Sequence, residues 1–202
     1  MKVKITFKEH VLGTLAGNKE LAQDFIASKH KEGLMQDEMK VIDSIDEEIQ
    51  KGTTIFPSDD KGAFIWDYQF KGFFKEATES VFVRSDNYTK EHLKKLGLTL
   101  YMYKKTLDKQ LFINPRKIYL NLSGPITIVE RPLRAQTMRG ERICLARSEA
   151  APAGTTCEFE IVIFKSCLKE VVPLCLDYGQ YSGMLQWRNS GAGSFTWEEV
   201  TK

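Results

Sequence analysis

The segment TCEFEIVIFKSCLKEVVPLCLDYG, residues 156–179, gives the clearest indication of the fold. Its first nine residues, TCEFEIVIF, predict a strand, and Leu168 to Tyr178 predict a helix. Pro173 is expected to kink this helix or to mark its first turn, because proline lacks the amide that a helix interior needs. From Gly179 the sequence predicts a loop, and GSFTWEEV (193–200) predicts a closing strand.

The sequence before this stretch adds strands and helices in no regular alternation. Val3, Ile5 and Phe7 alternate with charged residues, which is typical of a half-buried strand. Apolar residues from Phe70 to Val81 recur at three- and four-residue steps and predict a helix capped by Asp67. The other expected elements are helices over Lys19–Ser28, Asp37–Gln50 and Thr89–Asp108, and strands over Thr53–Phe56, Ala63–Trp66, 111–122, 125–130 and 141–149.

This order favours an α+β fold over the βαβα alternation of a doubly wound sheet. With 202 residues, of which 42% are hydrophobic, the chain can bury a sizeable core and fits one domain spanning 1–202. Residues 14–52 and 85–110 are expected to be helical insertions in that domain. The first 60 residues carry an excess of four acidic groups and the remainder an excess of six basic ones. A polyanion is therefore expected to meet the later part.

Several classes of protein are excluded by composition. No apolar run approaches the roughly 20 residues that span a bilayer, and MKVKITFKEH lacks a signal-peptide core, so we expect a cytoplasmic protein with no membrane partner. The four cysteines, which have no CxxC spacing, are expected to be buried reduced thiols. The three histidines are scattered, so we expect no metal and no cofactor. The cysteines are Cys144, Cys157, Cys167 and Cys175.

The most basic segment is ERPLRAQTMRGERICLAR, residues 130–147. Guanidinium groups offer planar paired donors that match phosphate, and they also stack on bases. Gln136 and Thr137 add donors for a base edge or a 2′-hydroxyl. The alternative is that the arginines pair with Glu130, Glu141 and Glu149 on a strand surface. The five arginines are Arg131, Arg134, Arg139, Arg142 and Arg147.

The second candidate segment is GQYSGMLQWRNSGAGSF, residues 179–195. Its four glycines allow backbone conformations in which amides crowd around an anion. Trp187 beside Arg188 offers a stacking surface next to a phosphate-pairing group, and Asn189, Ser190 and Gly191 add donors. A tight connection between strands explains the same glycines, and neither GxGxxG nor a P-loop is present.

A third candidate lies at the start of the helix from Asp67, where Tyr68, Gln69 and Lys71 are found. Helix N-terminal amides with a nearby lysine favour an anion. A lysine on an exposed helix face is the alternative. We expect the arginines and the C-terminal turn to converge on one face.

Together, these segments resemble a family. FIWDYQFKGFFKEA (64–77) is similar to the polar–x–Lys–Gly helix start of the repeat-associated CRISPR (RAMP) proteins, which include backbone and crRNA-processing subunits. Pro152-Ala153-Gly154-Thr155 resembles the Pro–x–Gly–Thr turn of their second half, and residues 179–195 resemble their terminal glycine-rich loop. The resemblance covers residues 62–77 and 130–197, and departs from the family at Met184-Leu185-Gln186. ERPLRAQT and QWRNSG are also similar to stretches of small phage-encoded proteins.

The resemblance implies a ferredoxin-like (RRM-like) antiparallel sheet with helices on one face, and RNA or a nucleotide held by the arginines and the loop. Our first hypothesis is a non-catalytic RNA- or nucleotide-binding protein, in a phage version an anti-defence protein that sequesters a nucleotide signal or interferes with CRISPR-type immunity. The second is a metal-independent endoribonuclease with His30 as its general base. The third is a protein-interaction module that docks a host defence protein or a phage partner. Self-association is a further expectation, since backbone subunits stack.

Overall fold

The computed structural model describes residues 1–16, 53–137 and 140–200. Its centre is a four-stranded sheet in the order β12–β1–β11–β7, in which every neighbouring pair is antiparallel. The predicted first strand and closing strand both belong to it. The four strands are β1 (Lys2–Phe7), β7 (Leu111–Asn114), β11 (Thr156–Ile163) and β12 (Phe195–Glu199).

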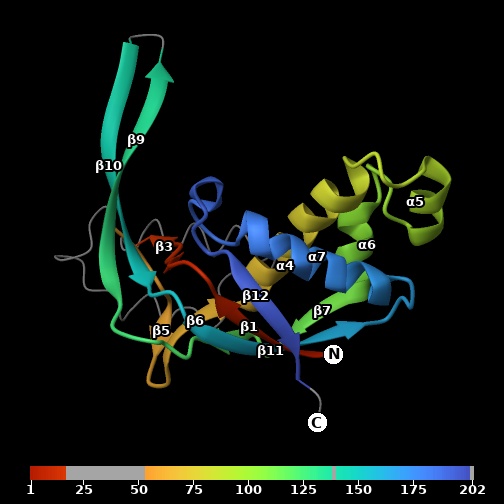
Figure 1. Cartoon of the computed structure of the whole chain (residues 1–202), viewed down its shortest axis with the longest axis horizontal. Helices are drawn as coiled ribbons and strands as arrows, with labels where there is room; N and C mark the ends of the chain where they lie inside the picture. The colour runs from red at the N-terminus through yellow and green to blue at the C-terminus, as the bar shows by residue number, and fades with distance from the viewer. Residues whose placement is uncertain (17–52, 138–139, 201–202) are drawn as a thin grey trace, which may run out of the picture.

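Two helices connect these strands by split crossovers. The chain runs from β1 through α4 (Asp67–Thr78) to β7, and from β11 through α7 (Leu168–Ser182) to β12. Strand β11 lies between β1 and β7, and β1 lies between β11 and β12. This is the ferredoxin-like arrangement. Figure 1 shows α4 and α7 on the same side of the sheet. The predicted α+β, ferredoxin-like class is therefore confirmed.

Aromatic side chains between the sheet and the two helices form much of the core. Phe70 of α4 packs against Phe159 of β11 with ring centroids 4.4 Å apart, and Phe73 meets Phe195 of β12 at 5.4 Å. All four rings are buried. Burying one such side chain contributes about 1.5–3 kcal/mol, so these contacts hold α4 firmly on the sheet.

Helix α7 continues past the predicted loop start. Gly179 lies inside the helix. A side chain has no room at this position, because the ring of Phe195 lies 2.2 Å from where a Cβ would be. Glycine at this position thus permits close packing of α7 on β12, a reason that the sequence alone does not reveal. The helix ends at Gly183, whose φ of +67° suits glycine.

A helical lobe follows α4, within the residues expected to form an insertion. The single helix predicted over Thr89–Asp108 is wrong, because the structure has α5 (Lys90–Leu96) and α6 (Tyr103–Gln110) instead. Gly97, with φ of +72°, ends α5 in the left-handed conformation typical of a helix C-terminus. A π-helical turn, η1 (Glu79–Val83), leads from α4 toward this lobe.

A long hairpin extends from the second sheet. Strand β9 (Thr127–Thr137) pairs antiparallel with β10 (Gly140–Ala151) along its whole length. The base of β10 pairs with β2 (Val11–Leu12) and, in parallel, with β4 (Thr53–Ile55), while β3 (Leu15–Ala16) pairs with β4. The outer half of the hairpin reaches away from the rest of the described chain (Figure 1). It carries the arginine-rich segment.

A third, small sheet lies at the start of α4. Strands β5 (Ser58–Asp59), β6 (Gly62–Trp66) and β8 (Lys117–Tyr119) form it. β8 and β7 divide the single strand expected over 111–122, and the Asn114–Pro115 peptide between them is cis. Within the described residues, no helix has the length and apolar character needed to cross a membrane.

Candidate nucleic-acid interface

The glycine-rich loop is a closed turn between α7 and β12. The Met184 amide donates to the Gly193 carbonyl at 3.0 Å, and the Gly193 amide donates to the His10 carbonyl at 2.9 Å. The amides of Ser190 and Gly191 donate to carbonyls within the loop. These four amides are occupied, so the glycines serve the close approach of the loop strands rather than a ring of free donors.

Trp187 stands at the outer part of this loop. Its backbone is left-handed, with φ of +58°, and Leu185 two residues earlier has φ of +67°. Such conformations cost a non-glycine residue about 1 kcal/mol or more each. The Trp187 side chain is 39% exposed. The loop therefore holds strained backbone while it presents an indole ring at the surface.

Arg131 of β9 lies directly against that ring. Its guanidinium carbon is 5.2 Å from the centroid of the Trp187 ring, and Nη2 donates to Oε1 of Gln186 at 2.7 Å. Only 6% of Arg131 is exposed, and burial lowers its pKa. The two other guanidinium nitrogens, Nε and Nη1, are buried without a hydrogen-bond partner among the described residues. This is a buried cation that no described carboxylate neutralises.

Arg188 joins the loop to α4. Its Nη1 forms an ion pair with Oε2 of Glu76, and both side chains are about one-third exposed. The neighbouring Asn189 and Ser190 are exposed in the short helix η2 (Arg188–Ser190), and Gly191 ends it with φ of +86°. Arg188 and Arg131 thus flank Trp187 in different ways, one paired with a carboxylate and the other not.

The hairpin divides the remaining arginines. Arg147 pairs with Glu130 directly across the ladder at 2.6 Å, and Arg134 approaches Glu141 at 3.8 Å. Because side chains alternate along a strand, Arg134 and Glu130 lie on the opposite face of β9 from Arg131. The expectation that all the arginines converge on one face is therefore wrong. The sequence could not reveal which arginine faces the loop without the register of the hairpin.

For the predicted site residues near the hairpin turn, the structure describes the backbone alone. Gln136 is opposite Glu141 in the ladder, Arg142 is opposite Ala135, and Thr137 is opposite Gly140. Arg139 and the candidate base His30 lie outside the residues that the structure describes.

The start of α4 is built differently from the loop site. Gln69 accepts a hydrogen bond from the Trp66 amide at 3.0 Å and donates to the Thr14 hydroxyl, so it caps the helix. Tyr68 stacks on Trp66. Lys71 donates to the Asp108 carbonyl at 3.0 Å and lies over the ring of Phe112. Burial lowers the Lys71 pKa. Lys71 is thus directed to α6 and β7, not to Arg131.

The Pro–x–Gly–Thr turn has a structural role. Gly154 has φ of +84°, its amide donates to the Phe7 carbonyl at 2.7 Å, and the Phe7 amide donates to the Thr155 carbonyl at 2.9 Å. The turn therefore fixes the end of β1 at the start of β11. Cys157 of β11 and Cys175 of α7 are buried, as expected, and burial raises the pKa of Cys175 to about 12. Cys167 is only half-buried, so the expectation of burial is wrong for it.

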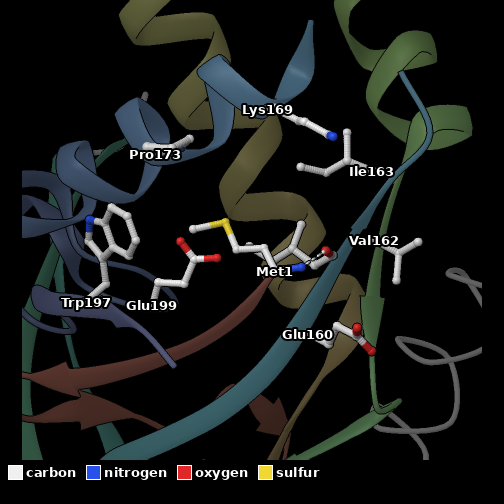
Figure 2. A pocket seen from close by; sticks show the side chains of 9 residues that line it. Met1, Glu160, Val162, Ile163, Lys169, Pro173, Trp197 and Glu199 are labelled. Carbon is white, nitrogen blue, oxygen red and sulfur yellow. Dashed lines mark hydrogen bonds between the residues drawn. The ribbon is translucent and has the colours of Figure 1, made fainter. Parts of the chain in front are cut away.

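A separate pocket of about 510 Å³ lies between β11 and α7 (Figure 2). Trp197 forms one wall and donates from its indole nitrogen to Asp177 at 2.8 Å. Glu160 and Glu199 line the pocket, with Lys169 as its one basic side chain. Two carboxylates beside a single lysine suit a phosphate poorly, so a phosphate-binding site is better sought at Arg131.

Sequence reasoning missed two residues of the candidate interface. Gln186 holds Arg131 and Glu76 holds Arg188. Both lie within segments that the sequence singles out, but neither was identified as a site residue. Their partners are 55 and 112 positions away in the chain, and no local spacing signals such pairs. Only the packing of the hairpin and of α4 against the loop brings them together.

Comparison with known proteins supports the fold alone. No protein-family model and no curated protein sequence matches the chain. A chain of the cryo-EM structure of the Type III-B Cmr-beta complex bound to cognate target RNA shares the fold, with a TM-score of 0.51 and 10% identity. The alignment covers 99% of the present chain, which spans 58% of that chain's length. A chain of a Type IV-B CRISPR complex has a TM-score of 0.51 and 9% identity. That alignment covers 100% of the present chain and 90% of the chain of the complex. At this level of identity, both similarities support the fold and do not establish membership of a family.

Proposed function

We propose that this chain is a non-catalytic RNA-binding protein that contacts RNA through the Arg131–Trp187 surface, defined by Arg131, Gln186 and Trp187. The observation that carries the proposal is the buried Arg131 guanidinium, of which two nitrogens have no hydrogen-bond partner in the part of the chain that the structure describes. Burying an unpaired charge costs several kcal/mol, so such a group is retained where an anion completes it. A phosphate offers two oxygen acceptors that match the paired N–H donors of the planar guanidinium.

Trp187 supplies the second half of this recognition. An exposed ring beside a cation binds single-stranded RNA by stacking a base while the cation meets a neighbouring phosphate. Stacking on an aromatic side chain contributes about 1–3 kcal/mol per base. The exposed Arg134 and Arg147 on the other face of the hairpin extend the positive surface, although each already has a glutamate partner.

Access to Arg131 requires a local movement. Gln186 and Trp187 cover the guanidinium, and the left-handed backbone at Leu185 and Trp187 stores strain in this same segment. A shift of the segment relieves that strain and exposes Nε and Nη1. We therefore propose that RNA binds by displacing Gln186 from Arg131 and stacking a base on Trp187.

The similarity to subunits of CRISPR complexes supports a CRISPR-related role within this proposal. More specifically, we propose that the protein interferes with CRISPR-type immunity, as an anti-defence protein of a phage does. It would do so either by occupying RNA or by taking the position of a subunit. A small nucleotide signal presents the same phosphate and base to the same residues. RNA and a cyclic nucleotide are therefore compared in one assay.

The test measures fluorescence anisotropy of a labelled single-stranded RNA with protein that has been stripped of nucleic acid in high salt. We expect binding that falls as salt rises, and a loss of about tenfold for Trp187→Ala. Phe164→Ala is the matched control, because Phe164 is also an exposed aromatic residue. Absence of affinity for RNA and for cyclic nucleotides overturns the proposal. Hairpin cleavage in EDTA that is lost in His30→Ala identifies an endoribonuclease instead.

A further inference from the structure

The helical lobe exposes a run of apolar side chains outside the RNA surface. Leu100, Tyr101 and Met102, in the connection between α5 and α6, are 47%, 91% and 47% exposed. Three consecutive exposed apolar residues are costly in a soluble protein unless they have a function. Two of them, Leu100 and Tyr101, border a pocket of about 550 Å³, which we call the α5–α6 groove. Its other lining residues are Val83, Lys90, Leu93, Lys94 and Thr99.

The groove combines an apolar floor with a basic rim. Leu93 is 8% exposed and, with the half-buried Val83, forms the floor. Lys90 and Lys94 lie one turn apart on α5, both exposed, so their ammonium groups border the same opening. The volume suits one or two large side chains rather than a whole peptide.

The charge around the groove is strongly positive. Six exposed lysines lie on α5 and α6, and none of them forms an ion pair with a described residue. The acidic groups nearby are Glu91 on α5, Asp86 before it, Asp108 on α6, which is paired with Lys75, and Glu79, which is bonded to Arg84 and Tyr103. The lysines are Lys90, Lys94, Lys95, Lys104, Lys105 and Lys109.

We propose that the α5–α6 groove docks an acidic amphipathic helix of a protein partner. One or two large apolar side chains of that helix enter the groove over Leu93, and its carboxylates meet Lys90 and Lys94 on the rim. An amphipathic helix is the common ligand of such a groove, recognised by apolar anchors at turn spacing. The charge complementarity of rim and ligand speeds association and sets specificity.

Two features favour a protein over RNA at this surface. Three of the four apolar residues that line the groove, Val83, Leu93 and Leu100, are aliphatic and Tyr101 alone is aromatic. RNA-binding surfaces, by contrast, stack bases on aromatic rings or guanidinium planes. The groove also holds no arginine, the residue that pairs with phosphate in two-point fashion. The lysines therefore act here as point charges around an apolar anchor.

The experiment uses a labelled amphipathic peptide of about 20 residues, long enough to form a helix. Its apolar stripe is leucine and phenylalanine, and its other positions are mainly glutamate. A scrambled peptide of equal composition and a peptide with lysine in place of glutamate are the controls. We expect the full-length protein to bind the acidic helix in preference to both, by fluorescence anisotropy.

Two variants test the groove itself. Leu100→Ser removes an exposed anchor contact and is expected to weaken peptide binding about tenfold. Lys94→Glu is expected to shift preference toward the lysine peptide, whereas Lys169→Glu, at an exposed site on α7, leaves the preference unchanged. Trp187→Ala, which impairs the proposed RNA surface, is expected to bind the peptide normally, so the two proposals fail independently.

Several results overturn this proposal. Equal binding of the scrambled peptide shows non-specific charge attraction. Competition by single-stranded RNA assigns the lysines to nucleic acid. Binding to phosphatidylserine vesicles that is lost in Leu100→Ser assigns the groove to a membrane surface. Self-association that depends on Leu100, measured by sedimentation, assigns it to a second copy of the chain.

Discussion

The guanidinium of Arg131 and the indole of Trp187 are 5.2 Å apart, yet they come from a hairpin strand and from the loop before the last strand. The contact unites two segments that the sequence singles out separately. Arg131 is also the one arginine of the hairpin's described side chains that is buried, since Arg134 and Arg147 are exposed and paired with glutamates. This relationship allows folding and binding to be tested against each other.

Replacing Arg131 by methionine is expected to separate stability from binding. Methionine fills the space without a charge, so the free energy of unfolding stays equal or rises by about 1 kcal/mol. RNA affinity falls, because the phosphate partner is lost, by about 1.5–3 kcal/mol. Urea unfolding and RNA titration measure the two effects. If Arg131 has only a structural role, the variant will instead be less stable and its RNA affinity will be unchanged.

The ion pair between Arg188 and Glu76 is expected to compete with phosphate. Glu76→Gln removes the competing carboxylate and should strengthen RNA binding by up to about fivefold, the value of a surface ion pair. The gain requires the guanidinium, so it should vanish in the double variant with Arg188→Ala. RNA titration at low salt measures both variants. Equal affinity of Glu76→Gln and the native protein indicates that Arg188 only ties the loop to α4.

Two glycines of the family-like motifs are expected to differ sharply on substitution. A Cβ at Gly72 meets nothing within 4 Å, so Gly72→Ala in α4 should stabilise the protein by about 1 kcal/mol. At Gly193, φ is +70° and a Cβ lies 2.2 Å from the Met184 carbonyl oxygen, so Gly193→Ala should destabilise it by about 2 kcal/mol or more. Thermal unfolding followed by circular dichroism compares them. Similar effects at both positions contradict the loop geometry.

Tyr103 is expected to make stability depend on pH in the alkaline range. Burial and a hydrogen bond to Glu79 raise the pKa of Tyr103 from its ordinary value of 10 to about 12. The neutral phenol is therefore favoured in the folded state. Its contribution is fully present below pH 10 and is lost as pH rises toward 12.

Tyr103→Phe tests this linkage, since it removes the titrating group and the bond to Glu79. The variant should be less stable than the native protein at pH 8, and the difference should narrow as pH rises from about 10 to 12. Urea unfolding at each pH measures it. Tyr101→Phe is the control, because Tyr101 is 91% exposed. A difference that does not change with pH contradicts the proposed linkage.

The sequence alone was sufficient to predict those helices and strands whose apolar side chains repeat at short intervals. The alternation of Val3, Ile5 and Phe7 identifies β1, and the spacing of Phe70, Phe73 and Phe74 identifies α4, because strands and helices have fixed side-chain periods. Gly97 shows where such reasoning fails. The leucine spacing over Thr89–Asp108 suits one helix, but a left-handed glycine ends it early.

Which charged side chains contact one another could be learned from the tertiary structure alone. The sequence identifies an arginine-rich segment and a loop with Trp187, but Arg131 faces that loop because of the hairpin register, and a slip of one residue would turn Arg134 toward it instead. Likewise Gln69 and Lys71, read as donors for an anion, are directed to a helix cap and to Asp108 by packing around α4. Side-chain periodicity is local, whereas the pairing of charges depends on contacts between segments far apart in the chain.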